Sequence, residues 1–206
     1  MSWKCFKLML LVAVLATSAQ ANLLSNGDFE TGDLTGWWTA NWGSEDQYIA
    51  VVTDGTYVAE IYTVGGDGVQ LGQDVAVGAS PVTVSLDYKV PAGSWNAMGV
   101  SVNYYDASGW LDYGWTLIYD YESAGGGDDA WHSYTTEGKP AGTGVGELEG
   151  LWTTPAGTTY ISMYISQWGW VSGDGAHYDN VVLTPEPATV LLLGLGGLAL
   201  IRRKRA

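Results

Sequence analysis

Alternating apolar and polar side chains run through the middle of the chain and predict β-strands. The pattern is clearest over residues 81–90, where Val and Leu alternate with Thr, Ser and Asp, so that one face is buried and the other hydrated. Residues 98–104 and 160–165 repeat it. Shorter strands are predicted at residues 48–52, 57–62, 69–77, 131–136 and 177–183. With no sustained helical period in this region, eight or so strands joined by Gly-rich turns predict an all-β sandwich.

Three segments interrupt this alternation and are predicted to be long loops. They are residues 106–115, which carry several aromatic side chains, the Gly-rich residues 123–130, and residues 137–149. Loops on a β-sandwich are where binding residues tend to lie, so these segments are the first places to look for a site.

The N-terminus has the pattern of a secretory signal peptide. Lys4 and Lys7 precede an apolar run over residues 8–16, and Ala19-Gln20-Ala21 follows as a small-x-small cleavage site. The run is shorter than the roughly 20 residues of a spanning helix. We therefore predict a signal peptide at residues 1–21, removed by signal peptidase; a retained N-terminal anchor is the alternative.

The C-terminus has the pattern of a membrane stop signal. Pro185-Glu186-Pro187 is followed by an apolar segment at residues 188–201, predicted to be a single transmembrane helix, and by four basic residues at 202–205. The prolines predict an extended, accessible stretch beside the membrane, and the basic cluster is expected to stay cytoplasmic.

This arrangement over residues 184–206 resembles the PEP-CTERM protein-sorting signal. The resemblance implies recognition by an exosortase, a membrane-embedded cysteine transpeptidase, and cleavage near Pro185-Glu186-Pro187. It also implies a Gram-negative source with an extracellular polysaccharide matrix, as in a biofilm. We expect an exported protein that is anchored transiently in the inner membrane before it reaches the cell surface or matrix. A plain tail anchor is the alternative.

Charge separates the middle of the chain from its ends. Residues 22–184 contain two lysines, no arginine and 21 acidic residues, a net charge near −19. Nucleic acid is excluded as a partner, because little positive charge remains to neutralise phosphates. The single cysteine, Cys5, lies in the predicted signal peptide, so the mature chain forms no disulfide.

The mature chain from residue 22 to residue 183 resembles carbohydrate-binding modules with the galactose-binding-like jelly-roll fold. The resemblance rests on residues 22–30 with Gly32, Leu34 and Gly36-Trp37, and on residues 53–59, 69–75 and 177–183. It implies a jelly-roll β-sandwich as a single domain. It also implies a structural Ca²⁺ held by Glu30, Asp54 and Asp179, with Asp28 in reserve. The alternative is that these acids cap turns and face water.

Aromatic side chains are the other candidate for chemistry. Ten of the eleven tryptophans lie outside the signal peptide, and Trp and Tyr combine a flat apolar face with a polar group. The candidates for a sugar-binding platform are Trp95, Trp110, Tyr113, Trp115, Trp168 and Trp170. The alternative is that such rings fill the core, as expected for Trp37 and Trp131.

Catalysis has little support in the sequence. His132 and His177 are the only histidines, and both fall in predicted strands, where a packed or surface role is the more frequent one. We therefore predict a non-catalytic exported protein that binds extracellular or cell-surface glycans. A calcium-dependent structural component of the polysaccharide matrix is the second hypothesis, and a small glycan-active enzyme is the third.

Overall fold

The computed structural model describes most of the predicted middle domain. The described residues are 22–43, 46–64, 68–77, 82–120, 124–137, 154–169 and 174–185. Several of the sequence predictions lie outside these residues, namely the signal peptide, residues 138–149, Trp170, Glu186, Pro187 and the helix at 188–201.

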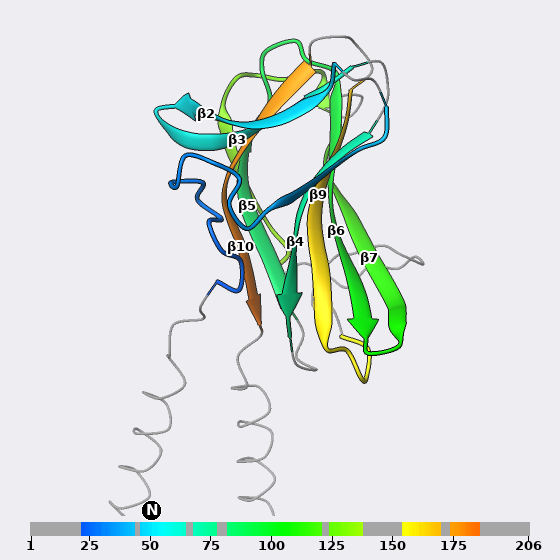
Figure 1. The fold of residues 1–206 in the computed structure, drawn as a ribbon. Helices are drawn as coiled ribbons and strands as arrows, with labels where there is room; N and C mark the ends of the chain where they lie inside the picture. The colour runs from blue at the N-terminus through cyan, green and yellow to red at the C-terminus, as the bar shows by residue number, and fades with distance from the viewer. Residues whose placement is uncertain are drawn as a thin grey trace, which may run out of the picture.

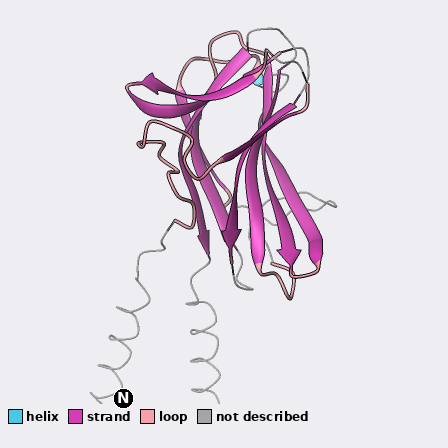
Figure 2. Ribbon diagram, viewed as in Figure 1, coloured by secondary structure: helices cyan, strands magenta, loops and turns pink. Residues whose placement is uncertain are grey.

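Among the described residues, ten strands make up nearly all the regular structure (Figure 2). They are β1 Trp38–Asn41, β2 Tyr48–Asp54, β3 Thr56–Thr63, β4 Gly68–Ala76, β5 Val82–Lys89, β6 Asn96–Asp106, β7 Gly109–Asp120, β8 Trp131–Thr135, β9 Tyr160–Gly169 and β10 Asp174–Pro185.

The strands form two antiparallel five-stranded sheets that face each other. Sheet A has the order β1-β4-β9-β6-β7, and sheet B has the order β2-β3-β10-β5-β8. Figure 1 shows β4, β9, β6 and β7 side by side in one layer, with β5 and β10 in the other. Strands far apart in the sequence are neighbours in both sheets, and the predicted all-β sandwich is confirmed.

The core lies between the sheets and is built from the apolar face of each strand. Val100 and Val102 on β6 and Met163 on β9 are fully buried on sheet A, opposite Val84 on β5 and Leu183 on β10 of sheet B. The polar residues that alternate with them point away from the core, as the sequence pattern predicts. Each sheet therefore has one face in the core and one outer face.

Two segments of sheet A that the sequence predicted to be a loop or a turn belong to strands. Residues 106–115 are not a loop: β6 ends at Asp106, two residues form a turn, and β7 begins at Gly109. On β7 the usual pattern is inverted, because the small residue Gly114 and the polar Thr116 pair with core residues of β6, which leaves aromatic side chains on the outer face. Likewise, Trp168 and Gly169 belong to the end of β9 rather than to a turn.

The first residues of the predicted mature chain are attached to the last strand. The Asn22 side chain accepts a hydrogen bond from the Leu183 amide at 2.9 Å and donates one to the Val181 carbonyl at 2.9 Å. The Leu23 amide adds a bond to the Leu183 carbonyl at 2.9 Å. Strand β10 continues to Pro185, opposite Val82, so the first proline of the predicted sorting motif ends a strand rather than lying in a free linker.

Polar side chains also bridge the two sheets inside the core. Gln167 on β9 is fully buried; its amide donates to the Ile61 carbonyl at 2.9 Å and its oxygen accepts the Tyr178 hydroxyl at 2.7 Å. Burial raises the pKa of Tyr178 well above its usual value, so the phenol remains a hydrogen-bond donor at physiological pH. These bonds fix the position of β9 relative to β3 and β10.

Candidate aromatic groove

An open groove of about 580 Å³ lies on the outer face of sheet A. Its floor is formed by the outward-facing residues of β4, β6 and β9, which alternate with buried core residues such as Val102 and Met163. The lining residues are Trp38, Trp42, Gln70, Asp74, Asn103, Tyr105, Tyr160, Ser162 and Tyr164. Five aromatic rings and four polar side chains thus share one surface, a composition typical of small-ligand sites.

Gly72 on β4 allows the Trp38 ring to approach the sheet closely. Gly72 pairs with Trp38 on β1 and with Tyr164 on β9, and a Cβ atom at this position would collide with the Trp38 indole and with Tyr164. The Trp38 and Tyr164 rings lie 5.9 Å apart at 48°. The Trp38 indole N–H donates to Asp74 at 3.2 Å, which fixes the orientation of the ring.

A second aromatic pair lies at one end of the β6–β9 ladder. Tyr105 and Tyr160 are opposite each other in the register, and their rings stack at 4.7 Å with an interplanar angle of 2°. Each ring presents an apolar face and a hydroxyl group, which suits contact with a sugar ring and its hydroxyls. The groove is therefore lined by two pairs of aromatic rings, Trp38 with Tyr164 and Tyr105 with Tyr160.

Four of the residues predicted as a sugar platform lie on this same outer face. On β7, Trp110, Tyr113 and Trp115 pair with the outward positions Tyr105, Asn103 and Ser101 of β6, so their side chains continue the groove surface to the edge of the sheet. Trp168 on β9 packs over Gly68 and Gly99. Strand pairing, rather than a common loop, brings these rings together.

The remaining tryptophans are distributed differently. Trp95 precedes β6, is half exposed, and does not line the groove, and Trp170 lies outside the described residues. Trp37 is in the core as predicted, with its ring 5.3 Å from that of Phe29. The prediction for Trp131 was wrong: it is 41% exposed, because its position on the edge strand β8 faces outward beside Lys89.

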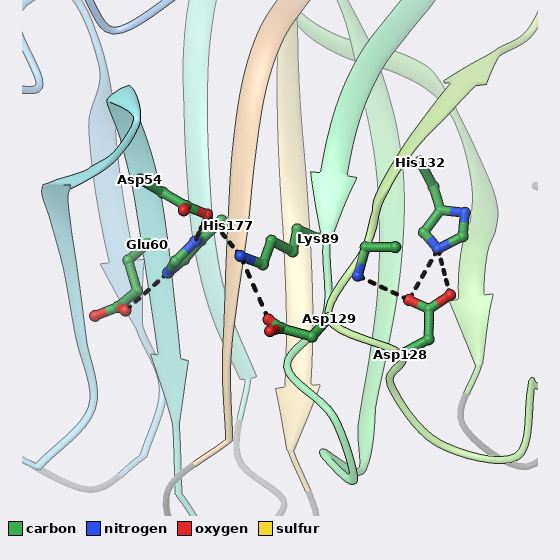
Figure 3. Close-up of polar contacts among 8 residues, drawn as sticks. Asp54, Glu60, Lys89, Asp128, Asp129, His132 and His177 are labelled. Atoms are coloured by element: carbon green, nitrogen blue, oxygen red, sulfur yellow. Dashed lines mark hydrogen bonds and ion pairs between the residues drawn. The ribbon is translucent and has the colours of Figure 1, made fainter.

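The outer face of sheet B carries ion pairs (Figure 3). His177 lies between Asp54 and Glu60, with its ring nitrogens 3.0 and 3.1 Å from the two carboxylates. Lys89 pairs with Asp54 at 2.9 Å and with Asp129 at 3.3 Å. The nearby Lys89 ammonium, followed by His177, lowers the pKa of Asp54. His132 pairs separately with Asp128 at 3.0 Å, so the two histidines belong to different clusters.

The carboxylates expected to bind calcium have different partners in the structure. Asp54 is engaged by Lys89 and His177, whereas Asp179 has Asp87, Glu30 and Asp28 as its acidic neighbours. Partial burial, and then these like charges, raise the pKa of Asp179. Among the described residues, no three His, Cys, Asp or Glu side chains are arranged to hold a metal ion. Calcium binding by Glu30, Asp54 and Asp179, with Asp28 in reserve, stays a prediction.

The groove contains aromatic residues that the sequence predictions missed. They are Trp38, Trp42, Tyr105, Tyr160 and Tyr164. One signal was present: Tyr160 and Tyr164 alternate with Ile161, Met163 and Ile165 and therefore had to lie on the outer face of β9. Aromatic rings on the hydrated side of a strand indicate a binding surface more directly than does their frequency in a loop.

Comparison with known proteins identifies the C-terminal segment. Residues 183–205 match the PEP-CTERM protein-sorting motif. No curated protein matches the sequence. Within the described residues, no helix has the length and apolar character needed to cross a bilayer. The matched segment begins at Leu183, the last fully buried residue of β10, so its first residues belong to that strand.

Similar solved structures include several carbohydrate-binding proteins. TmCBM61, solved in complex with β-1,4-galactotriose, has a TM-score of 0.53 and 17% identity, and the match covers 81% of this chain and 99% of that one. A carbohydrate-binding module of the β-sandwich superfamily described as having promiscuous specificity has a TM-score of 0.54 and 18% identity, over 81% of this chain and 64% of that one.

An enzyme chain shares the fold as well. The enzymatically active domain of tailspike protein 4 from bacteriophage CBA120 has a TM-score of 0.59 and 12% identity, over 80% of this chain. The match spans only 21% of the tailspike chain. At these identities the likeness establishes the architecture alone. The protein is thus a β-sandwich with the fold of carbohydrate-binding modules, and it carries a PEP-CTERM protein-sorting motif at its C-terminus.

Proposed function

We propose that this is an exported, non-catalytic protein that binds extracellular or cell-surface glycans through the outer face of sheet A. The observation that carries the proposal is the groove itself, where aromatic rings from the β1 region, β6 and β9 converge on one open surface. Sugar rings present apolar C–H faces and hydroxyl edges, which match aromatic faces beside amide, hydroxyl and carboxylate groups.

Two features of the groove support binding of a chain rather than a single sugar. It is open, and the exposed rings of Trp110, Tyr113 and Trp115 extend the same surface to the edge of the sheet. The preformed stack of Tyr105 on Tyr160 and the bond from Trp38 to Asp74 hold rings in place before a ligand arrives. Such preorganisation lowers the entropic cost of binding.

Export determines where this surface works. The PEP-CTERM motif supports processing by an exosortase and delivery to the cell surface or polysaccharide matrix of a Gram-negative bacterium. Because the matched segment begins within β10, the domain remains next to the membrane until the motif is cut. Glycans at or beyond the cell surface are then its natural partners.

Affinity electrophoresis of the domain comprising residues 22–185 tests this function. The panel holds β-1,4-galactan, xylan, chitosan and alginate, and each gel is paired with an assay for released reducing ends. We expect retardation by at least one polysaccharide without sugar release. Unretarded migration in every gel would refute glycan binding, and steady sugar release would place the protein among the enzymes.

A further inference from the structure

The polar lining of the groove carries a single formal charge, and that charge is negative. Asp74 is exposed on β4, and the one hydrogen bond described for its carboxylate comes from the Trp38 indole at 3.2 Å. The other polar lining residues, Gln70, Asn103 and Ser162, are neutral. A carboxylate offers about four acceptor positions, so most of the hydrogen-bonding capacity of Asp74 remains for a ligand.

Asp74 lies beside two aromatic rings rather than alone. Trp38 and Tyr164 flank Gly72 on the neighbouring strands, and Asp74 is the next residue of β4 on the same face. We call Trp38, Asp74 and Tyr164 the aromatic–carboxylate box. Aromatic faces attract cations through the ring quadrupole, and a carboxylate forms a charge-assisted hydrogen bond with an ammonium group. Together they provide both interactions that an ammonium group favours.

The distribution of charge over the rest of the protein also favours a cationic ligand over an anionic one. In the part of the chain that the structure describes, Lys89 is the only lysine and there is no arginine. Lys89 lies on sheet B, where it is paired with Asp54 and Asp129. Sheet A therefore has no described lysine or arginine to receive the carboxylates of a uronic-acid polymer, and the negative field of the mature chain repels such a polymer.

We propose that the aromatic–carboxylate box is a subsite for the protonated amino group of an amino sugar. The preferred ligand is then a glycan that contains unacetylated amino sugars, and not a uronate polymer. This inference rests on the proposed glycan binding and adds the chemical class of the ligand. Acetylation removes the positive charge while leaving the backbone of the sugar chain unchanged, and so isolates the interaction with Asp74.

Isothermal titration with two matched ligands tests the inference. The ligands are the hexamers of β-1,4-linked glucosamine and of β-1,4-linked N-acetylglucosamine, compared at pH 6 and low salt with the same domain. We expect the glucosamine hexamer to bind about fivefold to tenfold more tightly, the size expected of one partly exposed cation site. Asp74→Asn should remove this preference, and added salt should reduce it.

Asp129→Asn is the matched control, because it changes the net charge equally but lies just before β8, beside Lys89 of sheet B. A preference that survives Asp129→Asn and disappears in Asp74→Asn supports the subsite. Equal affinity for the two hexamers, or a preference that Asp74→Asn leaves intact, overturns the subsite while glycan binding stands. If the domain binds galactan or xylan but neither hexamer, the subsite is also overturned, and the proposed glycan binding stands. Failure to bind any glycan overturns the proposed function as well.

Discussion

The Trp38 indole occupies the space where a side chain of residue 72 would begin, so these two residues on neighbouring strands are sterically complementary. A glycine within a strand costs stability, since it adds conformational freedom to the unfolded chain and buries no side chain. At residue 72 the absence of a side chain allows a large ring to lie against the sheet, where it forms part of the groove wall.

Gly72→Ala tests this complementarity. The added methyl group must displace Trp38 and press on Tyr164, so we expect a loss of about 1–3 kcal/mol in the free energy of unfolding. Urea denaturation measures it. In a Trp38→Ala background the same substitution should cost less, because one of its two steric conflicts is gone. Equal costs in both backgrounds would show that Trp38 does not rest on residue 72.

Tyr178→Phe tests the polar bridge between the sheets. The substitution leaves the buried oxygen of Gln167 without the hydroxyl that now donates to it at 2.7 Å. We expect the free energy of unfolding to fall by about 1–3 kcal/mol, the cost of an unsatisfied buried acceptor. Tyr160→Phe is the control, because that ring is solvent-exposed on sheet A. Equal stability of the Tyr178→Phe variant and the wild type would contradict the role of the bridge.

Asp179→Asn tests the crowding of carboxylates beside β10. Because burial and nearby acids raise the pKa of Asp179, this residue contributes stability below its unfolded pKa of about 3.8, and the contribution is lost as pH rises through the higher folded pKa. The asparagine variant should lose less stability than the wild type between about pH 4 and pH 7. Urea denaturation across this range measures the difference.

Asp33→Asn is a control in which the pH dependence of stability is expected to change in the opposite direction. Hydrogen bonds from Thr35 and Thr31 lower the pKa of Asp33, so its contribution is present above the unfolded pKa and is lost as pH falls. Asp33→Asn should therefore reduce stability mainly at neutral pH. If Asp179→Asn altered the pH profile in this same direction, the carboxylates around Asp179 would not be repelling one another.

Calcium binding near Asp179 is a separate prediction. A divalent cation would relieve the repulsion among Asp179, Glu30 and Asp28 and would bind the folded state preferentially. We expect added Ca²⁺ to raise the midpoint of thermal unfolding and a chelator to lower it, with both responses lost in Asp179→Asn. A midpoint that responds to neither reagent would eliminate calcium, and with it the hypothesis of a calcium-dependent matrix component.

The strands that the sequence predicted are those with one buried and one hydrated face. Strand β5 has Val84 and Leu86 on its inner face and Ser85 and Asp87 on its outer face, so alternation alone identified it. Strand β7 was not predicted, because its inner face carries Gly114 and its outer face carries large aromatic rings. A binding surface made of aromatic residues thus reverses the pattern from which strands are usually recognised.

The sequence predicted a binding surface made of aromatic side chains, but not the residues that line the groove. The rings of Trp110, Tyr113 and Trp115 are close in sequence, and their clustering alone marked them as a candidate surface. The contact of Trp38 with Tyr164 depends on the order of β1, β4 and β9, which no local pattern specifies. The same holds for Asp54, whose partners Lys89 and His177 come from two other strands of sheet B.

The most direct test of glycan binding at the outer face of sheet A compares two exposed tryptophans on opposite sheets. Trp42 lines the groove and is 67% exposed, whereas Trp131 is exposed on sheet B. The variants Trp42→Ala and Trp131→Ala are each titrated with the polysaccharide that most retards the wild-type domain, and their affinities are compared. We predict that Trp42→Ala weakens binding about tenfold, as for an aromatic side chain that contacts the ligand, and that Trp131→Ala leaves it unchanged. Loss of binding in Trp131→Ala with full affinity in Trp42→Ala would contradict the account.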